Sequence, residues 1–103
     1  MNKKQCFTIG GVVYPCRMTM GAMLEFSQRT GKEATEIKGE ALSDILILLY
    51  CCLLSSCRAD GVSLPFSTEM EMADRIMPED IISWQTQNFS GEEKQTDESK
   101  KKE

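Results

Sequence analysis

The sequence contains no histidine, and this absence removes several kinds of active site at once. Histidine is the commonest general base near neutral pH, the usual partner of serine and cysteine nucleophiles, and a frequent zinc ligand. The one phosphate-loop-like pair, Gly31-Lys32, has Phe26 where the earlier glycine belongs and Glu33 where a hydroxyl residue belongs. We therefore expect no catalytic residues, no metal site, no cofactor and no enzymatic activity.

Long hydrophobic runs and an excess of positive charge are also missing. The longest apolar run, Ile45–Leu54, has ten residues, whereas a membrane-spanning helix needs about 20. The polar residues and glycines that follow the basic start do not form the apolar core of a secretory signal. The net charge is −4, while a nucleic-acid-binding face normally makes a domain basic. We expect a soluble cytoplasmic protein that binds neither membrane nor nucleic acid.

The five cysteines do not form a disulfide framework, because their number is odd and Cys51 and Cys52 are adjacent. Cys6 and Cys16 fall on opposite faces of a hairpin with a two-residue turn. The adjacent thiols point about 100° apart on a helix, so they suit one metal ion poorly. We therefore expect reduced thiols that act as small apolar residues.

Apolar spacing and turn residues predict one domain at residues 1–89 and a disordered charged tail at residues 90–103. The fold class is mainly α (α+β), with an N-terminal β-hairpin followed by a small bundle of about four helices. The last thirteen residues contain no apolar side chain and cannot repay the entropy of ordering. The expected elements are a hairpin of residues 5–9 and 12–17 and helices at Met20–Thr30, from 42–44 to 57–59, at 68–77 and from Pro78 onward.

Each expected helix has its own signals. Thr19 and Gly31 suit the two ends of the first helix, and Thr68 with Glu71 forms a capping box before the third. The second helix is apolar nearly all round and should be the centre of the core. The side chains expected to face inward are Met20, Ala22, Met23, Leu24 and Phe26 in the first helix, Leu42, Ile45, Leu46, Leu49, Cys52 and Leu53 in the second, Met72, Ala73 and Ile76 in the third, and Ile81, Ile82 and Trp84 in the fourth.

Methionine is frequent in this chain, which has seven, and its flexible side chain suits surfaces that adapt to a partner. Core filling is the other explanation. The candidates for partner binding are Met18 and Met20 at the junction of hairpin and helix, and Met70 off the inner stripe of the third helix. Trp84 and Phe89, beside the tail, either close the core or form part of the same surface.

The order of these elements resembles the tail assembly chaperones of long-tailed bacteriophages. The resemblance covers residues 8–87 and depends on Tyr14-Pro15-Cys16-Arg17 before a helix, the helix MGAMLEFSQRTGK, and Leu42-Ser43-Asp44 opening an apolar helix. Similar aromatic-Pro-hydrophobic-Arg, Thr-Gly-Lys and Leu-Ser-Asp patterns are frequent in that family. The cysteine-rich second helix departs from the family pattern.

The resemblance implies a non-enzymatic role in phage or prophage tail assembly. The implied partners are the tape-measure protein or other tail proteins, whose apolar helices the chaperone would keep from aggregating, and a second copy of the chain itself. Some family members are also made as a longer product by a translational frameshift.

Two other hypotheses remain open from the residues alone. The third and fourth helices could form the helix-turn-helix of a small regulatory or DNA-binding protein, although Glu79 and Asp80 would then face the phosphates. A thiol redox protein is the second alternative, although the sequence contains no C-x-x-C pair.

Overall fold

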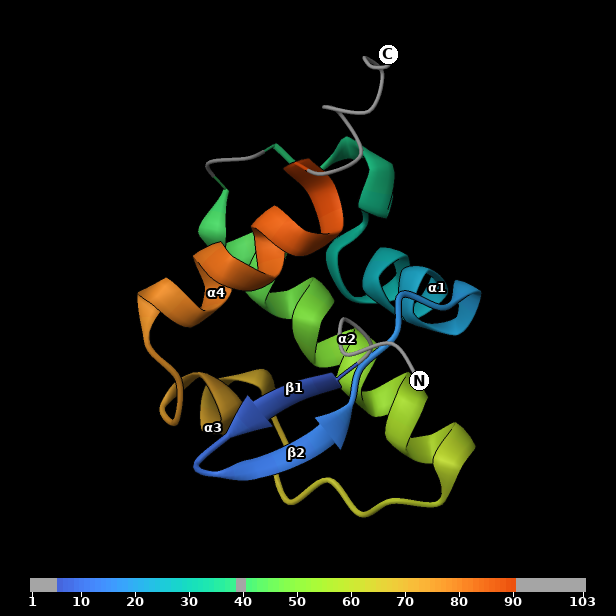
Figure 1. The fold of residues 1–103 in the computed structure, drawn as a ribbon. Coiled ribbons are helices and arrows are strands. Elements are labelled where there is room, and N and C mark those ends of the chain that lie inside the picture. Colours follow the sequence, from blue (N-terminus) through green and yellow to red (C-terminus); the bar gives the residue numbers. More distant parts are fainter. Residues whose placement is uncertain (1–5, 39–40, 91–103) are drawn as a thin grey trace, which may run out of the picture.

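The computed structural model describes residues 6–38 and 41–90, with side chains up to residue 88 (Figure 1). The chain forms an antiparallel β-hairpin and then four α-helices around one core, which confirms the predicted fold class. The predicted domain lies within the described residues except at its N-terminus and at residues 39–40. The predicted tail lies outside them from residue 91 onward.

The hairpin consists of β1 (Cys6–Ile9) and β2 (Val12–Pro15). Ile9 pairs with Val12, and Phe7 pairs with Tyr14, which is the predicted register. Gly10 has φ of 59° and Gly11 has φ of 83°. Two positive φ angles in succession define the tight hairpin turn that only glycine, asparagine and aspartate form readily, so the Gly-Gly pair fixes the register.

Helix α1 (Met20–Thr30) has the predicted bounds. The Thr19 hydroxyl accepts a hydrogen bond from the Ala22 main-chain N–H at 3.0 Å, and Gly31 takes the left-handed conformation that ends the helix. A short 3₁₀ turn, η2 (Ala34–Glu36), follows within the predicted connector.

Helix α2 (Leu42–Asp60) lies at the centre of the fold, with α1, α3 and α4 packed around it (Figure 1). Ten of its residues are buried, as predicted for the core helix. By length and composition α2 would also suit a membrane span, but 56% of its apolar stretch is buried inside the fold. The prediction that Leu42 faces inward is wrong, since its side chain is 45% exposed. Leu42 is the first residue of the helix, where neighbouring elements do not cover it.

The loop between α2 and α3 joins the hairpin to the core through Phe66. The Tyr50 hydroxyl donates a hydrogen bond to the main-chain carbonyl of Phe66 at 2.8 Å, within the protein interior. The ring of Tyr14 on β2 meets the Phe66 ring edge-on, with centroids 6.3 Å apart. This contact anchors an otherwise extended segment.

Helix α3 (Glu69–Ala73) ends earlier than the predicted residue 77. The main-chain N–H groups of Arg75 and Ile76 bond to carbonyls only three residues back, so the helix tightens into turns. Pro78 disfavours the helical conformation of the residue before it, and Met77 is extended.

Helix α4 (Pro78–Gln85) begins at the proline, as predicted, and leads into a π-helical turn, η3 (Thr86–Ser90). Ile81 and Trp84 are buried as predicted, but Ile82 is 53% exposed. Residues three apart share one face of a helix, whereas a neighbouring residue points about 100° away. The side chain of Ile82 therefore turns to solvent.

Candidate functional site

The four predicted partner-binding residues whose side chains the structure describes differ in exposure. Met20 and Met70 are exposed by 77% and 67%. Met18 is partly buried and packs against the core, and Trp84 is only 3% exposed and closes the core. The side chain of Phe89 lies outside the described residues. Of these four residues, Met20 on α1 and Met70 on α3 are therefore the two that a partner can reach.

Helix α1 carries two apolar stripes rather than the single broad side that the sequence predicted. Ala22 and Phe26 are fully buried against the core, whereas Met20 and Leu24 are 77% and 60% exposed. Each pair is four residues apart and forms a stripe, and the two stripes differ by two residues, or about 200° around the helix. Sequence reasoning therefore missed Leu24 as a surface residue, because both stripes are equally apolar.

The outer stripe of α1, defined here as Met20 and Leu24, lies on an uncharged helix face. Between Met20 and Gln28 the only ionisable residue is Glu25, which forms an ion pair with Arg29 at 3.1 Å. Arg29 also contacts Glu69 of α3 at 3.2 Å and lies over the ring of Tyr50. These contacts draw the charges of α1 toward α3 and leave the outer stripe apolar.

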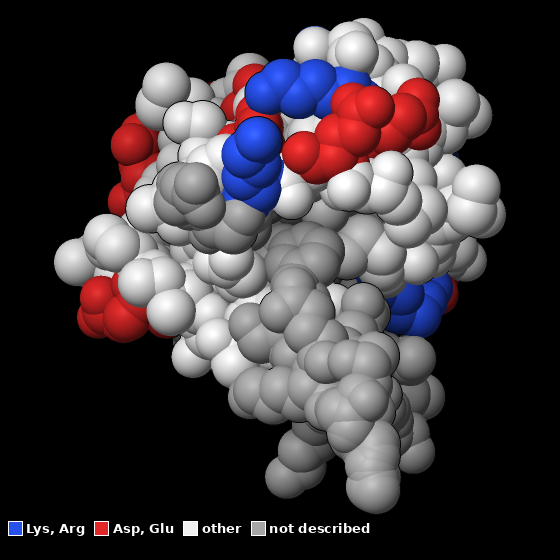
Figure 2. Space-filling view, turned by 90° about the horizontal axis from the view of Figure 1, so that it is seen from above, with Lys and Arg blue, Asp and Glu red and all other residues white. Residues whose placement is uncertain are grey.

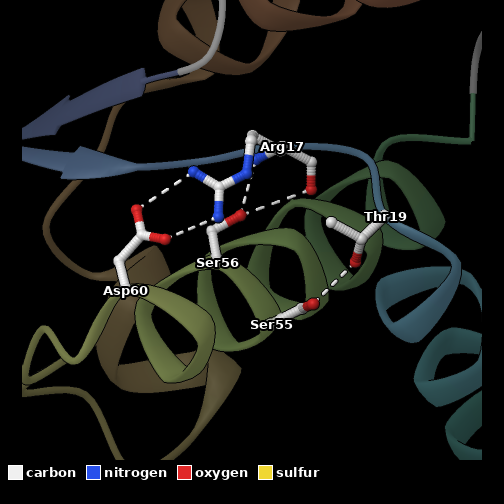
Figure 3. Close-up of polar contacts among 5 residues, drawn as sticks. All are labelled: Arg17, Thr19, Ser55, Ser56 and Asp60. Carbon is white, nitrogen blue, oxygen red and sulfur yellow. Dashed lines mark hydrogen bonds and ion pairs between the residues drawn. The ribbon is translucent and has the colours of Figure 1, made fainter.

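A polar cluster fixes the junction between the hairpin and α1 against the C-terminal half of α2 (Figure 3). The main-chain N–H of Arg17 donates to the buried Ser56 hydroxyl at 2.7 Å. The Arg17 guanidinium makes two hydrogen bonds to the Asp60 carboxylate, at 3.0 and 2.8 Å. The hydroxyls of Thr19 and Ser55 lie 2.6 Å apart. The cluster sets the position from which α1 starts.

The two helices approach closely beside this cluster. A Cβ atom added to Gly21 would lie 3.2 Å from the Ser55 hydroxyl oxygen, tighter than an ordinary contact. Glycine at this position thus permits the close approach and keeps the Thr19–Ser55 hydrogen bond in place. The groups of this cluster bond to one another and join the start of α1 to α2, so the cluster has the character of a structural clasp.

The Arg17–Asp60 pair predicts a defined pH dependence. The hydrogen bonds from Arg17, more than its charge alone, lower the pKa of Asp60 below its ordinary value of 3.8. A group whose pKa is lower in the folded chain contributes stability above the unfolded pKa and loses it as the pH falls through the folded pKa. Asp60→Asn should therefore lower the free energy of unfolding at neutral pH. The difference in this free energy between the variant and the unmodified protein should shrink below pH 3.8.

Urea midpoints measured at neutral and at acidic pH check this prediction. Asp74→Asn is the control, since Asp74 is exposed and forms no ion pair among the described residues. If the difference in urea midpoint between Asp60→Asn and the unmodified protein stayed the same at both pH values, the predicted pH dependence would be wrong.

Four of the five thiols are buried and reduced: Cys16, Cys51, Cys52 and Cys57. The Cys52 thiol donates to the sulfur of Met18 at 3.6 Å. A hydrogen bond with the Cys16 thiol, together with burial, raises the pKa of Cys52, and burial raises the pKa of Cys51 to about 11. The thiolate is the reactive form of cysteine, so these groups are protonated and unreactive near neutral pH. The predicted role as small apolar residues fits this setting.

Thiol labelling of the native protein should therefore be slow at Cys16, Cys51, Cys52 and Cys57. Their modification should require opening of the fold, which slows it by about a thousandfold or more for a domain of ordinary stability. Cys6, which is partly exposed, should react first. Mass spectrometry of peptides after timed exposure to iodoacetamide measures the order, with unfolded protein as the control. Rapid native labelling at Cys51 or Cys52 would instead support the redox alternative.

The α3–α4 acidic surface is a second exposed region, defined here as Met70, Met77 and Ile82 with the carboxylates of residues 69–80. The three apolar side chains are 67%, 59% and 53% exposed. Residues 69–80 contain five acidic residues and one arginine, a net charge of −4. Glu71 and Asp80 accept main-chain hydrogen bonds at the two helix starts.

Across residues 6–38 and 41–90, no group of three or more His, Cys, Asp or Glu side chains could hold a metal ion. No protein-family model, no curated protein and no solved structure matches this chain.

Proposed function

We propose that this protein is a non-enzymatic tail assembly chaperone of a long-tailed phage or prophage, which binds the tape-measure protein during assembly. The observation that carries the proposal is the exposed, uncharged outer stripe of α1, on a helix whose opposite face is buried in the core. Met20 and Leu24 contribute little to folding because they are mostly exposed, and two neighbouring apolar side chains on an uncharged helix face suit the apolar helix of a partner.

The order of elements supports the same proposal. The chain has the hairpin, the helix ending in Thr30-Gly31-Lys32, the apolar α2 and two short helices, which is the order that the family resemblance implies. The clasp at Arg17 and Ser56 holds the start of α1, so its outer stripe is presented in a fixed orientation.

The proposed mechanism is helix-on-helix docking. An apolar helix of the partner would lie along Met20 and Leu24 and bury their side chains, which are flexible enough to fit different sequences. Binding would remove the partner's apolar surface from water and delay its aggregation. No chemistry is required, which suits a chain without histidine.

The alternative of DNA binding gains no support. The N-terminus of α4, which would lead the supposed recognition helix, carries Glu79 and Asp80. Two carboxylates at that position would repel phosphates.

A pull-down with matched variants tests the proposal. The tagged protein is expressed with its surrounding gene cluster, and captured proteins are identified by mass spectrometry. Met20→Gln with Leu24→Gln should abolish capture of a very long, helix-rich partner. Leu42→Gln, which alters an exposed leucine on another helix, should retain it.

Complementation provides the decisive readout. A phage or prophage lacking this gene should build no normal tails until the unmodified gene is restored, and the double variant should fail to restore them. Normal tails in the absence of the gene would overturn the proposal.

A further inference from the structure

We propose that the α3–α4 acidic surface is a docking site for a basic amphipathic helix of another protein. This inference goes beyond the chaperone proposal, because it assigns a second surface and the chemistry of its occupant. Its test does not depend on whether the outer stripe of α1 binds a tape-measure protein.

The first observation is the clustering of exposed apolar side chains in one segment. Met70, Met77 and Ile82 lie within thirteen residues and are all more than half exposed. Main-chain hydrogen bonds such as Asp74 N–H to the Met70 carbonyl coil the chain before the extended Met77, and α4 coils it again afterwards; coiled chain rises only about 1.5–2 Å per residue. A partner helix of ordinary length, about 15–30 Å, is therefore long enough to span from one of these side chains to the next.

The second observation is the charge around them. Glu69 is paired with Arg29, whereas Glu71 and Asp80 accept main-chain N–H groups and form no ion pair within the part of the chain that the structure describes. Asp74 and Glu79 make no ion pair among the described residues. In the view from above of Figure 2, acidic side chains stand at the left margin, the side on which α4 lies in Figure 1; α3 lies lower in Figure 1 and is turned away from this view. A partner that binds here needs positive charge to complement these carboxylates.

These two observations together select one kind of occupant. Methionine adapts its shape to apolar side chains, and flanking carboxylates attract Lys and Arg, so the surface suits a helix with an apolar stripe and basic flanks. A second copy of this chain that docked through the same surface would place acidic residues against acidic residues. The chain's own residues 91–103 contain four lysines but no apolar side chain, and therefore cannot cover the methionines.

A peptide-binding experiment on the full chain tests the inference. The probes are two fluorescent helical peptides with identical leucine stripes, one flanked by lysines and arginines and one by glutamates. Anisotropy titration should show the basic peptide binding at least about tenfold more tightly, an advantage of about 1.4 kcal/mol, and this advantage should shrink as salt is raised.

Variants separate the two contributions. Met70→Gln with Met77→Gln should weaken binding of the basic peptide about tenfold or more, and Asp74→Asn with Glu79→Gln should reduce its salt dependence. Leu42→Gln, which alters an exposed leucine that belongs to neither proposed surface, should leave the binding of the basic peptide unchanged. Met20→Gln with Leu24→Gln is measured beside it and should keep the preference for the basic over the acidic peptide. The fluorescence of Trp84, the single tryptophan, verifies that each variant is folded.

Equal binding of the acidic and basic peptides would overturn the inference, and so would unchanged binding by the folded methionine variant. Loss of peptide binding on changing Met20 and Leu24 instead would assign the peptide to α1. None of these results would decide the complementation test of the chaperone proposal.

Discussion

Phe26→Ala is expected to lower the free energy of unfolding by about 3–5 kcal/mol. The ring is completely buried against the core, and its removal leaves a cavity between α1 and α2 in addition to the lost transfer free energy. A small domain has about 5–15 kcal/mol of stability in total, so this single change should bring the protein close to unfolding at physiological temperature. Urea denaturation followed by Trp84 fluorescence measures the loss.

Leu24→Ala is the matched control for this prediction. Leu24 lies two residues earlier in the same helix but is 60% exposed, so its change should alter the free energy of unfolding by no more than about 0.5 kcal/mol. Equal losses in the two variants would mean that the outer stripe of α1 is covered in solution, for example by self-association. Repeating the denaturation at several protein concentrations tests for self-association, because the stability of an oligomer depends on protein concentration.

Ser56→Ala is expected to cost about 1–3 kcal/mol, although it removes only one oxygen atom. The Ser56 hydroxyl is fully buried and accepts the Arg17 main-chain N–H at 2.7 Å. Alanine leaves that N–H without its partner at a site where water replaces the hydroxyl poorly. The hairpin would remain attached through the Phe66 contacts but would lose its fixed position at the start of α1.

Amide hydrogen exchange at Arg17 provides a second and more local measurement. The amide should exchange slowly in the unmodified protein and much faster in Ser56→Ala, while amides in the middle of α2 keep most of their protection. Ser63→Ala, in the exposed loop after α2, is the control and should change neither stability nor exchange at Arg17. Slow exchange at Arg17 in a folded Ser56→Ala protein would show that another group holds this backbone.

The clasp and the surface proposed to bind partners are connected through α1. Arg17 and Thr19 fix where the helix begins, and Gly21 fixes how closely it approaches α2. Because Ala22 and Phe26 then face the core, Met20 and Leu24 must point away from it. The orientation of the outer stripe is thus a consequence of packing at the inner stripe.

The sequence by itself determined the hairpin, both ends of α1 and the central helix of this protein. Gly10-Gly11 fixed the hairpin register, Thr19 and Gly31 fixed both ends of α1, and the apolar length of α2 made it the core helix. These are local effects, since positive φ angles, capping hydroxyls and a helix apolar on all sides have few alternatives. The absence of histidine likewise limited the chemistry without any structure.

Only the tertiary structure decided which apolar side chains are buried. Met20, Leu24, Leu42 and Ile82 are as apolar as the residues that form the core, and helical spacing alone placed them inward. Their exposure depends on where neighbouring elements end and on the angle at which each helix meets α2. The pairing of Arg17 with Asp60 and the contact of Met18 with Cys52 join residues more than thirty positions apart, so no local pattern could have indicated them.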